Sequence, residues 1–143
     1  MVKRVCMVLL LVLASGVLGC QQVRYDPARA TRPYPYHLHQ ANSIDIQVFR
    51  DKKWIEIVNS TPRSYHNVDL WINQRYVSHL DVLPAGKTVR LSLLEFYDER
   101  GEGVSAGGLL RTREPTPVRL VEMQLGEAEP LIGLITIRSE PAE

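Results

Sequence analysis

Residues 43–58 read Ser-Ile-Asp-Ile-Gln-Val-Phe-Arg-Asp-Lys-Lys-Trp-Ile-Glu-Ile-Val, and their alternation of apolar and polar side chains decides the fold. A period of two is typical of strands that bury one face. We expect a β-hairpin centred between Asp51 and Lys52, because this register collects the aliphatic side chains on one face. On the other face it places Phe49 opposite Trp54. The segment therefore predicts a hairpin with an aliphatic inner face and an aromatic pair outside.

A second hairpin is expected within residues 68–79, where the period of two recurs. Its turn is placed on Asn73 and Gln74, since asparagine is favourable at the first position of a two-residue turn. This centre sets Trp71 opposite Tyr76, again on the face away from the aliphatic residues. Both hairpins thus predict a cross-strand aromatic pair, an interaction that stabilises a sheet by about 0.2–1 kcal/mol.

Further strands are expected at 88–94, 118–125 and 131–138, with turn-forming residues at 83–87 and 98–108. The chain that follows the first twenty residues contains no stretch with the period of a helix. About 6–8 short strands with frequent turns are typical of an all-β fold, either an antiparallel sandwich or a partly open barrel.

Three segments resemble the small immunoglobulin-like β-sandwich modules of bacterial envelope proteins. They are the asparagine-rich turn 59–61, the beginning of a strand at 67–70, and the Pro-Gly turn with its following strand at 83–89. In those modules the same three features occur in this order. The resemblance implies an antiparallel immunoglobulin-like β-sandwich, and it implies no particular function because one fold serves many functions.

The first 19 residues have the features of a secretory signal peptide. Lys3 and Arg4 precede an uncharged, largely apolar run, 5–18, and a small residue stands before Cys20. This run of 14 residues is shorter than the roughly 20 residues that a membrane-spanning helix requires. We therefore expect export of the chain and removal of the signal.

The end of this segment, Val17-Leu18-Gly19-Cys20, resembles the lipobox of bacterial lipoproteins. The resemblance implies cleavage before Cys20, a thioether-linked diacylglycerol on its sulfur and usually an acyl group on its amine. Two or more acyl chains anchor a protein stably in a membrane. Gln21 stands where an aspartate would mark inner-membrane retention, which favours the outer membrane, facing the periplasm. The alternative is an ordinary cleaved signal that leaves an unmodified thiol.

These features divide the chain into four parts: a signal peptide, 1–19, a lipidated N-terminus and tether, 20–42, a β-domain, 43–139, and a short tail, 140–143. The tether has prolines among arginines and tyrosines and no apolar periodicity, which favours an extended spacer. Its Pro-Tyr-Pro-Tyr run, 33–36, is interpreted either as a linker whose tyrosines pack loosely on the domain or as a ligand for a partner protein.

Charge and cysteine content exclude several classes of function. Two of the 17 basic residues and none of the 16 acidic ones lie in the signal, so the mature chain has 15 basic against 16 acidic residues and a net charge of −1. Such a chain has no basic field for nucleic acid, and we expect no nucleic-acid partner. Cys6 leaves with the signal and Cys20 is the expected anchor, so the folded part has no thiol for disulfides, catalysis or metal ligation.

Motifs for metal binding and catalysis are weak. His37 and His39 would point to one side of a strand, but two ligands in a linker make a poor metal site. The serines lack the Gly-x-Ser-x-Gly context of a nucleophile elbow, and the acidic residues near Asp98 lack the spacing of a calcium loop. We therefore predict no enzyme activity, no catalytic residue, no metal and no cofactor, and we rank a hydrolytic enzyme last among the functions considered.

The two aromatic pairs supply the strongest functional hypothesis. They form a flat face with polar neighbours if solvent reaches them, and such faces suit protein or sugar contacts. The residues of this predicted binding face are Trp71, Tyr76, Phe49, Trp54, Asp69 and Ser78. We expect a lipid-anchored envelope protein that binds or scaffolds a protein partner without catalysis, and alternatively one that binds a glycan or small ligand. On this hypothesis, alanine at Trp71 and Tyr76 abolishes partner binding and leaves the domain folded.

Overall fold

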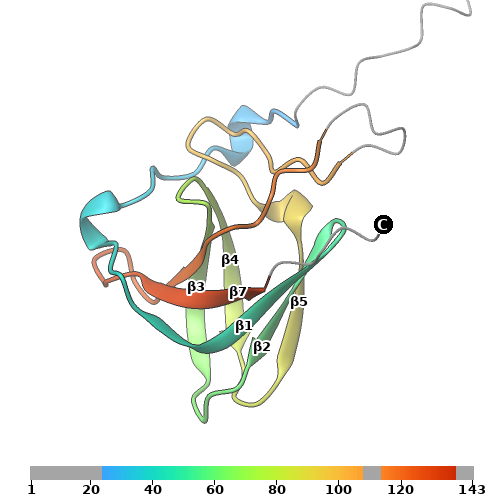
Figure 1. Ribbon diagram of the computed structural model, residues 1–143. Coiled ribbons are helices and arrows are strands. Elements are labelled where there is room, and N and C mark those ends of the chain that lie inside the picture. Colours follow the sequence, from blue (N-terminus) through green and yellow to red (C-terminus); the bar gives the residue numbers. More distant parts are fainter. Residues whose placement is uncertain (1–23, 108–113, 138–143) are drawn as a thin grey trace, which may run out of the picture.

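The computed structural model describes residues 24–107 and 114–137, in which seven strands form one mixed sheet in the order β4-β3-β6-β7-β1-β2-β5. The strands are β1 (Ser43–Asp51), β2 (Trp54–Asn59), β3 (Tyr65–Ile72), β4 (Tyr76–Leu83), β5 (Thr88–Ser92), β6 (Val121–Gln124) and β7 (Ile132–Ile137). Short 3-10 turns lie at η2 (Pro27–Arg29), η3 (Tyr36–Leu38) and η4 (Leu93–Glu95). The sheet curls into a nearly closed barrel (Figure 1). The predicted all-β class is confirmed, and the expected signal segment, 1–19, lies outside the described residues.

The expectation of a wholly antiparallel arrangement is wrong at one pair of strands. β1 and β7 run parallel, with Ser43 opposite Gly133 and a register shift between Ile44 and Gln47. Consecutive hairpins give antiparallel neighbours, but these two strands come from opposite ends of the domain, where no turn constrains their relative direction. All seven strands belong to a single continuous sheet, so of the two predicted architectures the partly open barrel is closer to the observed one.

The first hairpin has a different register from the predicted one. Lys52 and Lys53 form its two-residue turn, Lys52 has a φ of 53°, and Trp54 pairs with Asp51. Phe49 consequently faces Glu56, so the predicted Phe49–Trp54 pair is wrong. The register differs by two residues, which leaves every side chain on its predicted face, and the aliphatic inner face is confirmed.

The second hairpin differs by one residue, with a larger consequence. Its loop has three residues beginning at Asn73, so Trp71 pairs with Val77 rather than with Tyr76. The Asn73 side chain holds this loop by accepting backbone N–H bonds from the segment 117–120 and donating one to it. A one-residue shift moves side chains to the opposite face. Trp71 therefore points out of the barrel and Tyr76 points into it.

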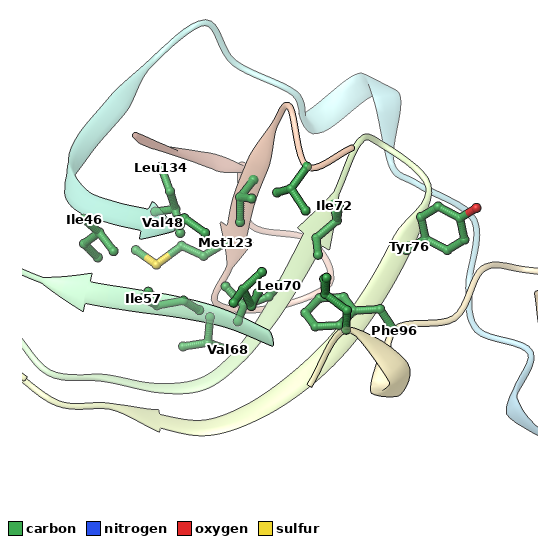
Figure 2. Close-up of a cluster of buried hydrophobic side chains, with 14 of the residues drawn as sticks. Ile46, Val48, Ile57, Val68, Leu70, Ile72, Tyr76, Phe96, Met123 and Leu134 are labelled. Carbon is green, nitrogen blue, oxygen red and sulfur yellow. The ribbon is translucent and has the colours of Figure 1, made fainter. Parts of the chain in front are cut away.

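The barrel interior is an apolar core to which every strand contributes (Figure 2). The core residues that have no exposed area include Ile46, Val48, Ile57, Val68, Leu70, Ile72, Phe96 and Met123. β6 is buried on both faces: Val121 and Met123 face the core, whereas Glu122 and Gln124 face outward and are covered by other parts of the chain. Glu122 and Gln124 are therefore polar side chains that are buried on the outer face of the sheet.

The cover is the segment 24–42, here called the strap, which crosses the outside of the barrel (Figure 1). The Asp26 N–H donates to the carbonyl of Gly101 at 2.9 Å, and Gly101 allows this close approach because it has a φ of 82° and no side chain. Farther along, Tyr34 is buried against Trp71, and Leu38 accepts a backbone bond from Leu131 at 3.0 Å. The predicted extended tether over 20–42 is therefore wrong for residues 24–42, which are held by the loop 98–103 and by the outer face of the sheet.

Candidate functional site

The structure does not bring the six residues of the predicted binding face together. Trp71 has no exposed area beneath the strap, and Tyr76 is 8 % exposed on the inner side of the barrel. Asp69 shares the outer side with Trp71, whereas Ser78 lies opposite Leu70 on the inner side. The predicted exposed Trp71–Tyr76 pair is wrong because the three-residue loop places the two rings on opposite faces.

Phe49 and Trp54 remain on the outer surface, on β1 and β2. Phe49 is 36 % exposed and lies beside Ile137 of the neighbouring parallel strand. The Trp54 ring is covered by two cations, with Arg90 at 5.1 Å and Lys53 at 5.5 Å from the ring centre. The Phe49 ring therefore has an aliphatic neighbour and the Trp54 ring has cationic neighbours, and the two rings do not form a pair.

Under the strap, a buried carboxylate is the centre of a polar cluster. Glu122 on β6 is 1 % exposed. Its Oε2 accepts a hydrogen bond from the Tyr34 hydroxyl at 2.7 Å, and its Oε1 lies 2.7 Å from Nδ1 of His39. Burial and the adjacent Glu122 carboxylate raise the pKa of Tyr34, so this hydroxyl stays protonated and continues to donate. Strap and sheet are therefore joined by charge-assisted hydrogen bonds.

A second cluster lies beside the first on the same outer face. The Arg32 guanidinium donates to Asp69 at 2.6 Å and to the Gln124 side chain at 2.9 Å. Gln124 also accepts from the indole N–H of Trp71 at 3.3 Å, and Asp69 lies 2.8 Å from Nδ1 of His79. Polar residues at alternate positions of β6 predict a solvated face, so the sequence pattern did not reveal that the strap covers them.

The pH dependence of this contact can be measured with Tyr34→Phe. Because its pKa is raised in the folded state, the Tyr34 hydroxyl stabilises the fold fully below its unfolded pKa of about 10, and this stabilisation is lost as the pH rises further. We expect the substitution to lower the free energy of unfolding by about 1–2 kcal/mol at pH 8. This deficit should shrink at pH 11, measured by urea unfolding of both proteins. A deficit that stays constant with pH would contradict the assignment.

A surface cleft opens between the strap and two turns. Its volume is about 470 Å³, within the range of roughly 300–1,000 Å³ typical of small-molecule sites. It is lined by Pro33, Tyr34, Tyr36, Asn73, Gln74, Arg75, Asp98, Glu99 and Arg100. The rings of Tyr34 and Tyr36 meet edge to face with centres 4.8 Å apart, and Tyr36 is 70 % exposed. The cleft therefore combines an accessible aromatic ring with amides and charges of both signs.

One wall of the cleft is held rigidly by Asp98. This carboxylate is buried and accepts two bonds from Arg75, at 2.9 and 2.7 Å, and backbone bonds from Arg100 and Glu102. Burial by itself would raise the pKa of Asp98, but these bonds outweigh it and lower the pKa. Glu99 and Arg100 are exposed at the rim, and within the described part of the chain their side chains form no hydrogen bond or ion pair. They are available for a ligand.

Of the two histidines considered as metal ligands, His39 lies with its Nδ1 2.7 Å from Oε1 of Glu122, and His37 is exposed. Within residues 24–107 and 114–137, no group of three or more His, Cys, Asp or Glu side chains is arranged to hold a metal ion. The same part of the chain contains no helix long and apolar enough to cross a membrane.

On this geometry and side-chain chemistry, the cleft is the candidate site. Comparisons with protein-family models, with curated proteins and with solved structures found no match to this chain.

Proposed function

We propose that this chain is a bacterial envelope lipoprotein, anchored through lipid on Cys20, whose folded domain binds a polar ligand in the cleft without catalysis. The anchor follows from the resemblance of residues 17–20 to a lipobox. The cleft is the observation that supports ligand binding, because an exposed ring lies there beside two rim charges whose side chains form no hydrogen bond or ion pair within the described residues. An outer-membrane location facing the periplasm is part of the proposal and rests on Gln21.

The chemistry of the lining favours a glycan or a small polar ligand. Tyr36 offers a rigid ring with a hydroxyl, a combination that contacts apolar and polar parts of one ligand at low entropic cost. Asn73 and Gln74 also line the cleft, and Glu99 and Arg100 supply an acceptor and a planar donor. Sugars present both kinds of surface, since their C–H faces are apolar and their hydroxyl groups donate and accept hydrogen bonds.

The full-length protein with Tyr36→Ala tests this function. We expect oligosaccharides from the bacterial envelope to bind the unsubstituted protein, and the substitution to weaken binding at least about tenfold, which corresponds to about 1.4 kcal/mol. Titration calorimetry measures the change. The matched control is His37→Ala, which removes an exposed neighbouring ring outside the lining. Equal weakening by both substitutions, or binding that neither affects, would argue against the cleft.

Protein binding is a second candidate, favoured by an exposed apolar patch on the outer face of β1 and β7. Phe49, Ile135 and Ile137 are 36–39 % exposed and lie on adjacent strands. Contiguous apolar surface of this kind often marks protein contacts. In-cell crosslinks that disappear with Phe49→Ser and Cys20→Ala, and that persist with Tyr36→Ala, would favour an anchored adaptor over a ligand-binding protein.

A further inference from the structure

Very little chain separates the proposed anchor from the folded domain. Cys20 and Arg24 are four residues apart, and four residues of fully extended chain span at most about 14 Å. Arg24 is already part of the fold, since its carbonyl accepts the N–H of Gly103 at 2.7 Å. A domain attached in this way lies next to the bilayer, whereas a free tether over 20–42 would let it stand several nanometres away.

The attachment also selects one end of the barrel. Tyr25 forms a β-bridge with Glu102, and the Asp26 N–H donates to the Gly101 carbonyl, so the segments 24–30 and 98–103 lie together at that end (Figure 1). The turns at 60–63 and 84–87 lie at the opposite end. We infer that the end formed by residues 24–30 and 98–103 rests on the bilayer surface, and that the barrel stands on it with the opposite turns away from the membrane. This inference rests on the proposed anchor at Cys20.

The side chains of this end suit the interface between lipid and water. Tyr25 is 64 % exposed, and tyrosine is enriched at that interface because its ring is apolar and its hydroxyl polar. Arg24 and Arg29 are exposed beside it, and arginine can bury its stem while its head stays hydrated. Three arginines of the two segments stand against four acidic residues, so the charge of this end is nearly balanced and neither strongly repels the end from a membrane nor requires anionic lipid.

The orientation bears on the candidate site. The cleft is lined by residues 98–100, which belong to the membrane-facing end, and by Tyr36 and the loop that begins at Asn73. A ligand in the cleft therefore lies close to the lipid headgroups. We expect the headgroup or glycan portion of a membrane lipid to reach it more readily than a ligand dissolved in the periplasm.

Two single-cysteine variants of the full-length lipidated protein test the orientation. Ala28→Cys lies on the membrane-facing end and Ser60→Cys on the opposite end, and both positions are exposed. Each is labelled with a nitroxide in vesicles of phosphatidylethanolamine, phosphatidylglycerol and a nickel-chelating lipid, whose paramagnetic effect falls steeply with distance. Because an eight-residue strand spans about 26 Å, we expect the nickel lipid to relax the label at position 28 at least about fivefold more than the label at position 60.

Equal effects at the two positions, or a stronger effect at position 60, would overturn the orientation while leaving the anchor intact. A label that attaches to Cys20 of the unsubstituted protein would overturn the anchor itself, and with it the inference, so the two failures are distinguishable. Ala30→Cys, also exposed, provides a second membrane-facing position if Ala28→Cys perturbs the turn.

Discussion

Replacing Gly133 with alanine is expected to destabilise the domain strongly, although it adds only a single methyl group. An alanine Cβ at this position would overlap the backbone carbonyl of Asn42, where the strap enters β1. Backbone cannot rotate away as a side chain does, so the parallel β1–β7 pairing must shift or break. We expect a loss of about 2–4 kcal/mol in the free energy of unfolding. This corresponds to a fall of about 10 °C in Tm, measured by thermal and urea unfolding.

Gly126→Ala is the matched control. Its Cβ would meet only the Cγ of Glu129 at 3.3 Å, and this atom belongs to a flexible, exposed side chain that can move aside. We expect a change within about 0.5 kcal/mol. If Gly133→Ala and Gly126→Ala had the same Tm, the pairing of β1 with β7 would not depend on the close backbone approach at Gly133.

Trp71→Ala is expected to have the second large effect, a loss of about 3–5 kcal/mol. Trp71 is fully buried and meets Tyr34 edge to face with ring centres 5.3 Å apart. The Arg32 guanidinium lies 5.0 Å from the centre of the Trp71 ring, and the indole N–H of Trp71 donates to the Gln124 side chain. Removing the indole opens a cavity beneath the strap and leaves Gln124 with one donor fewer. This outcome reverses the expectation from sequence that the substitution leaves the domain intact.

Urea unfolding and limited proteolysis together measure this effect. The strap should become the first site of cleavage in Trp71→Ala, because its main apolar contact on the sheet is lost. Trp54→Ala is the comparison, since that ring is partly exposed on the other side of the barrel and its loss should cost about 1 kcal/mol. Similar losses for the two tryptophans would show that the strap does not depend on Trp71.

The hairpins show how far local pattern predicts a β-fold. The alternation in 43–58 predicted which side chains face the core, and a register error of two residues left this result unchanged. In the second hairpin the error was a single residue, because the length of the loop at Asn73 depends on its bonds to the distant segment 117–120. That one residue separated Trp71 from Tyr76 and removed the predicted binding face.

The candidate site could not be predicted from the sequence because its parts meet only through tertiary contacts. The strap has no periodicity, since it is held at single positions such as Arg32 and Tyr34 between prolines. Its composition therefore resembles that of a spacer. The polar clusters beneath the strap were hidden for a related reason, because Glu122 and Gln124 follow the sequence pattern of a solvated strand face. The parallel β1–β7 pair likewise joins distant segments without a connecting turn.

The proposed location, the orientation of the barrel and the environment of the cleft all depend on the lipid anchor at Cys20. The most direct test is the intact mass of the protein purified from the membrane fraction of its own cells, with fragmentation of its N-terminal peptide. If Cys20 is the anchor, the chain begins at Cys20 and carries a diacylglyceryl group and an amide-linked acyl chain. A chain that retains residues 1–19, or one that begins at Cys20 with a free thiol, would contradict it.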